Sequence, residues 1–361
     1  MTAPTTSDHP ARQTLRARAV TTLARQRRAL ADIGVALLVP ASAAIFGLVL
    51  EDTFPVNGNP QTFSGARWGI MICALCLLVG AVAGRRWVYQ RTGTLYSLSF
   101  LDETMNDYHK EAQDAAERSH MGVRLIGRRV DVLGRECDGV VDVVQPRQDL
   151  SRALESAMNQ DRDDTGYAVA PNLLWPAALA VGASLIRTDK MRFLDYNKTT
   201  TTEFRLRDKA AERVAVRTKS DHIVAMPTGD RRGVLLSFGP AAAKFDIDQR
   251  CAEFGISELV RIGPHSQVQG HQLSGPEMGR LADDLARHLA DIKNADDREL
   301  VVVAFIPKTV ALLTGWHLSR QQVRFFTGTH LMHHIQLGDR FVALRVHPSQ
   351  PTSFPAPWPG V

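Results

Sequence analysis

The chain has 361 residues, 44% of them hydrophobic and 22% charged, a composition typical of a folded globular protein. This length accommodates two compact domains together with attached segments. The net charge is only +5, and no run of Lys and Arg interleaved with aromatic residues occurs in the body of the chain, which argues against DNA or RNA polymers as partners.

Two apolar runs stand near the start of the chain. Residues 33–50 read IGVALLVPASAAIFGLVL and residues 68–84 read WGIMICALCLLVGAVAG, without a charged residue in either run. At a rise of about 1.5 Å per residue, each run covers most of a hydrocarbon core about 30 Å thick. A buried core helix explains one such run, but two in succession favour membrane spans. We therefore predict a basic segment over 1–32 and a two-helix transmembrane region over 33–87.

The flanking charges predict the orientation of these spans. Glu51, Asp52 and a single Arg67 lie in the loop between the runs. Arginines dominate the outer flanks, at Arg12, Arg16, Arg18, Arg25, Arg27, Arg28, Arg85, Arg86 and Arg91. The excess of positive charge on cytoplasmic loops then places both termini in the cytoplasm, with a multi-pass anchor in the membrane.

The C-x-x-C pair Cys73 and Cys76 lies inside the second apolar run, with no His or second Cys pair nearby. We interpret these cysteines as small buried hydrophobic residues rather than as a zinc or redox site. The following segment, RTGTLYSLSFLDETMNDYHKEAQDAAERS, has helix-forming residues with alternating acids and bases in its second half. It predicts a linker or stalk helix over 88–120, with a surface helix of the next domain as the alternative.

After residue 121, short apolar runs alternate with amphipathic helical patterns. Strands are predicted at 140–144, 167–170, 191–194, 233–238, 258–262, 300–305 and 323–326. Helices are predicted at 149–159, 175–185, 241–254 and 276–292, and from Pro307 to Leu318. This alternation is typical of βαβ units, so we predict an α/β fold with Rossmann-like parallel sheets covered on both faces.

One stretch of the sequence occurs twice in similar form. LWPAALAVGASLIRTDKMRFL at 174–194 resembles FIPKTVALLTGWHLSRQQVRFF at 305–326. Each copy has a Pro near the start of a helix, a glycine inside it (Gly182 or Gly315), and a closing Arg-Phe pair, although the alignment needs two small gaps. Chance similarity between two βαβ units is the alternative. We predict a duplicated domain over 121–348, with halves at about 121–232 and 233–348, followed by a flexible Pro-rich tail over 349–361.

In open parallel sheets, ligands bind beyond the carboxyl ends of the strands, where helix N-termini also face. Lys308 and Thr309 offer charge, hydroxyl and helix dipole to a phosphate, although solvated loop residues would have the same composition. The predicted ligand-binding residues at these strand ends are Gln145, Asn172, Trp175, Tyr196, Lys198, Ser237, Gly239, Lys308, Thr309 and Thr327.

Sequence patterns for catalysis and metal binding are weak. The chain contains no P-loop, G-x-G-x-x-G, G-x-S-x-G or H-E-x-x-H motif. His330, His333 and His334 lie close together, but His333 and His334 would face opposite sides of a strand and no acidic residue is adjacent, so we predict no metal site. His330 and Asp195 are the best general-base candidates, and neither has an evident partner.

The order of parts resembles the SAVED-domain membrane effectors of bacterial CBASS anti-phage systems, in which two spans precede a fused pair of CARF-like Rossmann halves. The segments that carry the resemblance are GVLLSFGP, VVVAFIPKTVALLTGWHL with VRFF, and LLWPAALAVGASL with MRFLDYN. The resemblance covers about 121–348 for the sensor and 33–84 for the membrane part.

This resemblance implies a receptor without catalytic residues, anchored in the bilayer of a bacterial inner membrane. Its ligand would be a cyclic di- or trinucleotide made by a functionally linked nucleotidyltransferase, with no other cofactor. Binding would drive homo-oligomerisation, and the gathered helices would disrupt the membrane. Two alternatives remain, a membrane-anchored nucleotide-processing enzyme and a membrane-tethered interaction scaffold.

Overall fold

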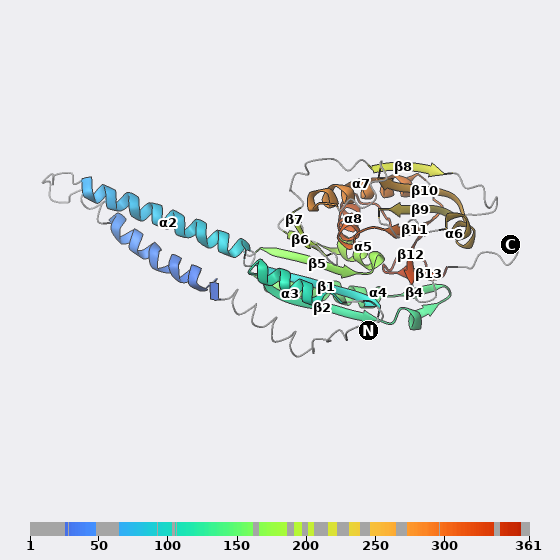
Figure 1. The fold of residues 1–361 in the computed structure, drawn as a ribbon, viewed down its shortest axis with the longest axis horizontal. Helices are drawn as coiled ribbons and strands as arrows, with labels where there is room; N and C mark the ends of the chain where they lie inside the picture. The colour runs from blue at the N-terminus through green and yellow to red at the C-terminus, as the bar shows by residue number, and fades with distance from the viewer. Residues whose placement is uncertain are drawn as a thin grey trace, which may run out of the picture. The chain divides into compact units, whose positions relative to one another are not determined.

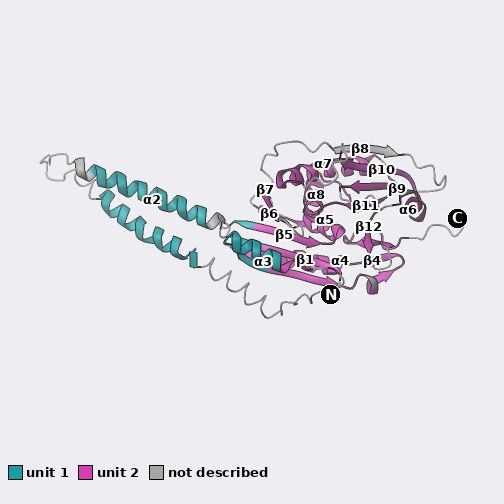
Figure 2. Cartoon of the chain, in the orientation of Figure 1, with its two compact units in different colours: residues 1–95, 110–124, 161–167 teal, residues 96–109, 125–160, 168–361 magenta. Residues whose placement is uncertain are grey.

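The computed structural model describes residues 26–27, 29–47, 65–91, 93–102, 105, 107–161, 166–185, 191–196, 201–205, 216–221, 231–238, 246–264, 273–295, 297–335 and 340–354. The chain divides into two compact units, coloured separately in Figure 2. Unit 1 comprises Met1–Leu95, Lys110–Arg124 and Asp161–Tyr167. Unit 2 comprises Tyr96–His109, Leu125–Gln160 and Ala168–Val361, and it contains every predicted ligand-binding residue that the structure describes.

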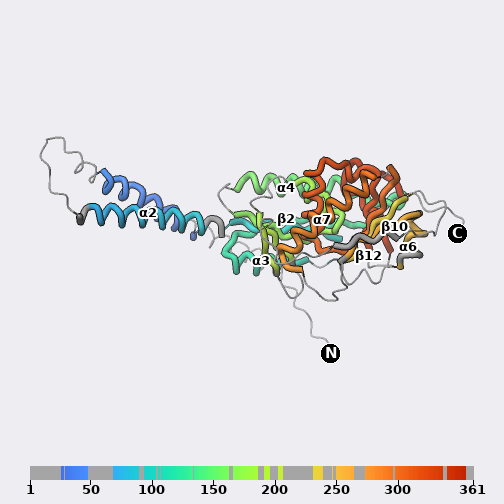
Figure 3. The backbone as a smooth tube through the Cα atoms, turned by 90° about the horizontal axis from the view of Figure 1, so that it is seen from above, coloured from blue at the N-terminus to red at the C-terminus, as the bar shows by residue number. Residues whose placement is uncertain are grey.

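Unit 1 contains two long apolar helices. One covers Ala29–Gly47 and the other, Trp68–Val88, lies within α2 (Gly65–Arg91), with mean hydropathies of 2.0 and 1.9. Figures 1 and 3 show them side by side. Arg85 Nε donates to Asp32 Oδ1 at 2.8 Å, which joins the beginning of the first helix to the end of the second. The two apolar runs therefore form a helical hairpin, each helix long and apolar enough to cross a membrane.

The surface of this hairpin is apolar. Within the described residues, every exposed large hydrophobic side chain except Leu125 belongs to one of these two helices. Soluble proteins rarely expose so large a contiguous apolar surface, so the hairpin surface suits an apolar environment. Cys73 and Cys76 are also exposed on α2, so the expectation that they are buried is wrong.

The first sheet has the strand order β2-β1-β5-β6-β7. Its strands are β1 (Thr94–Asp102), β2 (Gly122–Val130), β5 (Tyr167–Leu173), β6 (Met191–Tyr196) and β7 (Thr201–Arg205). The helices between these strands are α3 (His109–Arg118), α4 (Val144–Gln160) and α5 (Trp175–Ser184). The β5 sequence YAVAPNL is buried at every position, as expected for a central strand covered on both faces.

The second sheet has the order β3-β4-β13-β12-β11-β9-β10-β8, and β9 to β12 within it are parallel (Figure 1). Its strands are β3 (Glu136–Cys137), β4 (Val140–Asp142), β8 (Val216–Asp221), β9 (Arg231–Ser237), β10 (Ile256–Pro264), β11 (Glu299–Phe305), β12 (Thr329–Ile335) and β13 (Arg340–Arg345). The associated helices are η1 (Leu133–Arg135), α6 (Ile247–Glu253), α7 (Gly275–Asn294) and α8 (Lys308–Arg320). The helix α7 begins with a capping box formed by Ser274 and Glu277.

The two sheets repeat one topology. The order β7-β6-β5-β1-β2 of the first sheet matches β13-β12-β11-β9-β10 of the second, with helices at corresponding places in the chain. Where α5 meets α8, a Cβ on Gly182 would lie 1.8 Å from the carbonyl oxygen of Leu312, and one on Gly315 would lie 1.8 Å from that of Leu179. Each residue of one pair is 133 positions from its counterpart (179 to 312, 182 to 315), so the contact is reciprocal. This confirms the predicted α/β fold class and the duplication.

Three predicted elements differ from the structure. The segment 88–120 was expected to form a linker or stalk helix, but it contains β1 and α3, and β1 is a buried strand between β2 and β5. The first half therefore contains a strand that begins at Thr94, well before residue 121. Residues 323–326 do not form a strand: residues 323–324 are irregular, and Phe325 and Phe326 are buried in a turn ahead of β12. The helix α4 begins at Val144, the last residue of the predicted strand 140–144.

The beginning of the predicted tail is packed rather than flexible. Gln350 is 5% exposed, and Phe354 packs against a core cluster that includes Phe254 and Val303. The Phe354 backbone N–H donates to the carbonyl oxygen of Asp138 at 3.0 Å. Residues 355–361 lie outside the described residues.

Candidate functional site

The beginning of α8 contacts the carboxyl ends of two strands from the other half. Lys308 Nζ donates to Asn172 Oδ1 of β5, and Thr309 Oγ1 donates to Asp195 Oδ1 of β6 at 2.6 Å. Asn172 is 2% exposed and Thr309 is fully buried. Residues more than one hundred positions apart in the chain thus form one polar cluster, which we call the α8 site.

The local sequence explains why these strand-end residues meet α8. Pro307 is the N-cap of α8 and provides no side-chain hydrogen bond, so the first N–H groups of the helix need acceptors from elsewhere. Asp195 accepts hydrogen bonds from both the hydroxyl and the backbone N–H of Thr309. A carboxylate from β6 therefore supplies the cap that the helix lacks, and its negative charge is favourable at this end of the helix dipole.

Burial shifts both charged groups of the α8 site. It raises the pKa of Asp195 above its ordinary value, although the hydrogen bonds from Thr309 and the charge of Lys308 act in the opposite direction. It also lowers the pKa of Lys308, against the opposing effects of Asp195 and Asp107. The Lys308 ammonium lies 5.5 Å from the ring centre of Tyr108, within the range of a cation–π interaction. A partly dehydrated cation of this kind binds an anion more strongly than a solvated surface lysine does.

The beginning of α5 makes the corresponding contact with β12. Trp175, the first residue of α5, is 8% exposed, and its Nε1 donates to the carbonyl oxygen of Met332 at 3.3 Å. The next residue of β12, His333, is also 8% exposed. Burial lowers the pKa of His333 to about 4, and the charges of His334 and Lys308 act in the same direction. The start of α8 therefore meets charged and polar side chains, whereas the start of α5 contacts β12 through Trp175 and a backbone carbonyl oxygen.

The structure brings together three of the predicted ligand-binding residues, Asn172, Lys308 and Thr309. Trp175 lies at the start of α5 and bonds to β12 instead. Ser237, half-buried, lies at the same edge of the second sheet, because it pairs with Phe305 at the end of β11. Tyr196 is the last residue of β6 and pairs with Thr201 in β7. Lys198 and Gly239 lie outside the described residues.

The remaining two predicted residues lie elsewhere. Thr327 was placed at the end of a strand, but it is exposed in the turn before β12, at the amino edge of the sheet. Gln145 is exposed in the first turn of α4, where its Nε2 donates to Asp149 Oδ1 at 2.9 Å. Neither residue lies at the end of a strand, because β12 and α4 begin at other residues than the sequence predicted.

Sequence reasoning did not find all the residues of this region. Asp195 was thought to have no partner, but Thr309 and Lys308 surround it. Tyr108 was assigned to the stalk, and His333 was considered only as a metal ligand. Tyr108 and His333 carry no local sequence signal, because their positions depend on β1 and β12 lying in two different sheets.

His330 lies at the opposite edge of the second sheet, in the second position of β12. Its Nε2 is 3.2 Å from Glu299 Oε2, and Glu299 also accepts from Arg231 Nε at 3.0 Å. The expectation that His330 has no acidic partner is therefore wrong. Within the described ranges, no group of three or more His, Cys, Asp or Glu side chains is placed to hold a metal ion.

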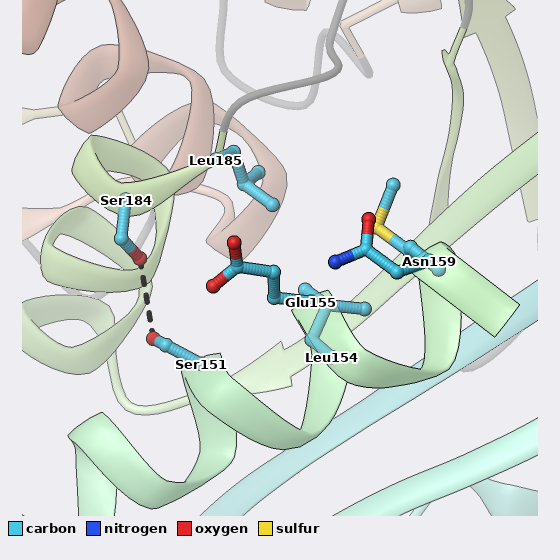
Figure 4. A pocket seen from close by; sticks show the side chains of 7 residues that line it. Ser151, Leu154, Glu155, Asn159, Ser184 and Leu185 are labelled. Carbon is cyan, nitrogen blue, oxygen red and sulfur yellow. Dashed lines mark hydrogen bonds between the residues drawn. The ribbon is translucent and has the colours of Figure 1, made fainter.

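A pocket of about 610 Å³, including space that opens to solvent, lies between α4 and the end of α5. Figure 4 shows the Glu155 carboxylate pointing into this space, beside the hydroxyl groups of Ser151 and Ser184, which are 3.2 Å apart. The remaining lining residues are Leu154, Met158, Asn159 and Leu185. The pocket is at the carboxyl end of α5, whereas Trp175 marks its amino end.

No protein-family model and no curated protein matches the sequence. Solved structures of SAVED/CARF-domain receptors do match. The Acinetobacter baumannii Cap4 receptor with 2'3'3'-cAAA matches at a TM-score of 0.42 and 9% identity, covering 75% of this chain and 55% of that chain. The same receptor with 3'3'3'-cAAA has a TM-score of 0.42, 11% identity and the same coverages.

The Moraxella osloensis Cap4 receptor matches at a TM-score of 0.41 and 8% identity, covering 75% of this chain and 53% of that chain. The chain therefore spans about half the length of the receptors it matches. The predicted resemblance is confirmed as a similarity to SAVED/CARF receptors.

Proposed function

We propose that unit 2 is a receptor for a cyclic di- or trinucleotide, and that the α8 site binds one phosphate of this ligand. The observation that carries the proposal is the contact of Lys308 and Thr309 with Asn172 and Asp195, which joins the two repeated halves at their strand ends. A doubly wound fold binds ligands at this edge, and a helix N-terminus with a lysine favours a phosphate. Repeated halves also suit a ligand built of repeated nucleotides.

The apolar hairpin supports the rest of the proposal. We infer that it anchors the receptor in a bacterial inner membrane as a multi-pass protein with both termini cytoplasmic. A ligand that binds only the assembled form stabilises an oligomer by RT ln(1 + [L]/Kd), about 4 kcal/mol at a thousandfold excess over Kd. The assembled hairpins would then disrupt the bilayer in an anti-phage response, with a nucleotidyltransferase supplying the ligand. This proposal assigns no chemical step to the receptor.

The raised pKa of Asp195 and the lowered pKa of Lys308 favour one alternative, a nucleotide-processing enzyme. Perturbed carboxyl and amino groups in one site are also what acid–base catalysis requires. The two functions differ in one respect: an enzyme converts its ligand, whereas a receptor releases it unchanged.

The test uses the full chain in detergent micelles. Thermal unfolding is followed with 2'3'3'-cAAA, 3'3'3'-cAAA and cyclic di-adenylate, with linear tri-adenylate and NAD as controls. A receptor shows a shift of several degrees with a cyclic compound only, larger particles in light scattering, and unchanged ligand after incubation. If the ligand is converted during incubation, the protein is an enzyme rather than a receptor. If no cyclic compound shifts the unfolding temperature, both functions are overturned.

A further inference from the structure

His333 combines deep burial with an unmet hydrogen bond. Its side chain is 8% exposed, and among the described residues its Nδ1 has no hydrogen-bond partner. Leaving a polar atom buried and unpaired costs about 1–3 kcal/mol, so folded proteins contain few such atoms. When such an atom lies beside a candidate ligand site, a ligand that supplies the missing hydrogen-bond partner explains why the atom is unpaired.

The register of the second sheet places His333 next to the α8 site. Met332 pairs with Val303 of β11, so His333 lies one residue further along, near the end from which the chain passes to α8. Met332 faces the core cluster with Phe254 on the α6 side. Successive residues of a strand face opposite sides, so His333 faces away from α6. Lys308 is close enough for its charge to lower the pKa of His333.

The charge state of His333 restricts what it binds. Because burial lowers its pKa to about 4, the imidazole is neutral at cytoplasmic pH. A neutral imidazole has one donor nitrogen and one acceptor nitrogen, and it does not pair with phosphate as a cation would. Lys308 is therefore suited to the charged part of a nucleotide, and His333 to an uncharged part.

We propose that His333 is a ligand-binding residue whose Nδ1 forms a hydrogen bond with an uncharged group of the nucleotide, a base edge or a ribose hydroxyl, next to the phosphate bound by Lys308. This inference rests on the proposed function and assigns to the α8 site a second, neutral contact. Trp175 borders this contact, because its Nε1 is bonded to the carbonyl oxygen of the residue before His333.

The test is His333→Phe in the full chain, which keeps a planar ring and removes both nitrogens. For whichever of 2'3'3'-cAAA and 3'3'3'-cAAA binds the wild type, we expect about a tenfold loss of affinity. Without ligand, the variant should unfold at the same or a higher temperature, because an unpaired polar atom has left the core. If His333 had only a structural role, the substitution would not lower ligand affinity while leaving the unfolding temperature unchanged.

The matched control is His334→Phe, on the other face of β12, where His334 lies 4.9 Å from the Phe341 ring. We expect this variant to keep wild-type affinity. If His333→Phe fails to fold, His333→Asn takes its place: its side-chain amide retains hydrogen-bonding capacity near Nδ1, so affinity within a few-fold of the wild type is expected, and a large loss in the folded variant counts against the inference.

Three outcomes are distinguishable. If the wild type binds none of the cyclic compounds, the proposed function fails and this inference with it. Equal binding by wild type and His333→Phe overturns this inference alone. If affinity falls, a 2'-deoxy analogue identifies the group, because loss of the tenfold difference assigns the contact to the ribose hydroxyl, whereas its persistence assigns it to the base.

Discussion

Gly182 of α5 and Leu312 of α8 lie so close that a Cβ atom on the glycine would stand 1.8 Å from the leucine carbonyl oxygen. Gly315 and Leu179 repeat this contact with the roles of the helices exchanged. The two halves of the fold are therefore joined backbone to backbone, without side chains between them at these points. Only glycine permits such an approach, which explains why both copies of the repeated segment contain one.

Replacing either glycine by alanine should weaken this contact. Because the nearest atom is a backbone carbonyl oxygen, the helices must separate, and we expect Gly182→Ala or Gly315→Ala to cost about 3 kcal/mol. This corresponds to a fall of roughly 5–10 °C in the melting temperature of the full chain in detergent. Gly263→Ala is the control, because the nearest atom to its Cβ would be at an ordinary 3.4 Å. Equal melting temperatures for all three variants would contradict the close contact.

Removing the charge of Lys308 should weaken ligand binding. We expect Lys308→Met to lower affinity for the cyclic compound that binds best by about 10- to 100-fold, since a charge-assisted hydrogen bond contributes about 1.5–3 kcal/mol. Wild-type affinity should also fall with rising salt, whereas the variant should respond less. Arg152→Met, with a side chain 69% exposed on α4, removes the same charge outside the site and should leave affinity unchanged. Isothermal titration measures the affinity of both variants. If Lys308→Met keeps the wild-type affinity, Lys308 does not belong to the ligand site.

The ion pairs of Glu258 should make stability depend on pH. Its carboxylate accepts from Arg232 and Arg298, each at 2.7 Å, and its side chain is 14% exposed. Burial raises the pKa of Glu258, but the two arginines outweigh this effect and the net pKa is below its ordinary value. A lowered folded pKa stabilises the protein above the unfolded value of about 4.3 and loses this contribution as the pH falls through the folded value.

We therefore expect Glu258→Gln to destabilise the chain by about 2–4 kcal/mol at pH 7, because two partly buried arginines lose their partner. The difference from wild type should shrink below about pH 4. Unfolding by urea at a series of pH values measures this, with the exposed Glu155→Gln on α4 as the control. A difference that stays constant down to pH 3 would show that the ion pairs do not stabilise the fold.

Gln350 should be required for the end of the chain to stay packed. Its Oε1 accepts from two backbone N–H groups at 2.7 and 2.9 Å, and its Nε2 donates to two backbone carbonyl oxygens at 3.0 and 3.3 Å. Gln350→Leu removes these four hydrogen bonds, and we expect a loss of about 2–4 kcal/mol in unfolding free energy. Ser349→Ala, one residue earlier, should change it by less than about 0.5 kcal/mol. Similar losses in both variants would contradict this role.

The hairpin should determine membrane association. We expect Leu75→Arg, in the middle of α2, to reduce the membrane-bound fraction of the full chain, because an arginine at the centre of a span costs about 2.5–3.5 kcal/mol. Leu125→Arg, outside the hairpin, is the control for adding one positive charge at an exposed leucine. Fractionation of cells by ultracentrifugation gives the answer, and a wild-type chain found entirely in the supernatant would exclude the anchor.

Local patterns in the sequence predicted the hairpin and much of both sheets. The charge-free runs form helices, as predicted. The apolar segments around Tyr167 and Leu300 form central strands, and they were predictable because a strand buried on both faces has a continuous hydrophobic sequence. The strand β1 was missed for the opposite reason. Ser97 and Ser99 are 2% and 3% exposed, so polar residues inside TLYSLSFLD concealed a buried strand.

The site was predictable only in part. Lys308 and Thr309 stand at a helix start that the sequence marks with a preceding Pro. Their partners Asn172 and Asp195 are 136 and 114 positions away, so only the packing of the two halves reveals them. Local periodicity contains no information about such distant pairs, and the same holds for the register that places His333 near Lys308.

The position of the short strand β4 in the chain affects when the second sheet can be completed during synthesis. It lies between β2 and α4 in the first half, yet it pairs with β13 of the second sheet, and Asp142 bonds to Arg345, 203 positions later. Contacts this distant in sequence form slowly, since a long loop must close before they contribute. During synthesis, the apolar hairpin leaves the ribosome before β13 exists. We therefore expect the hairpin to form before the second sheet is complete, so that a chain truncated before β13 contains the hairpin but an incomplete second sheet.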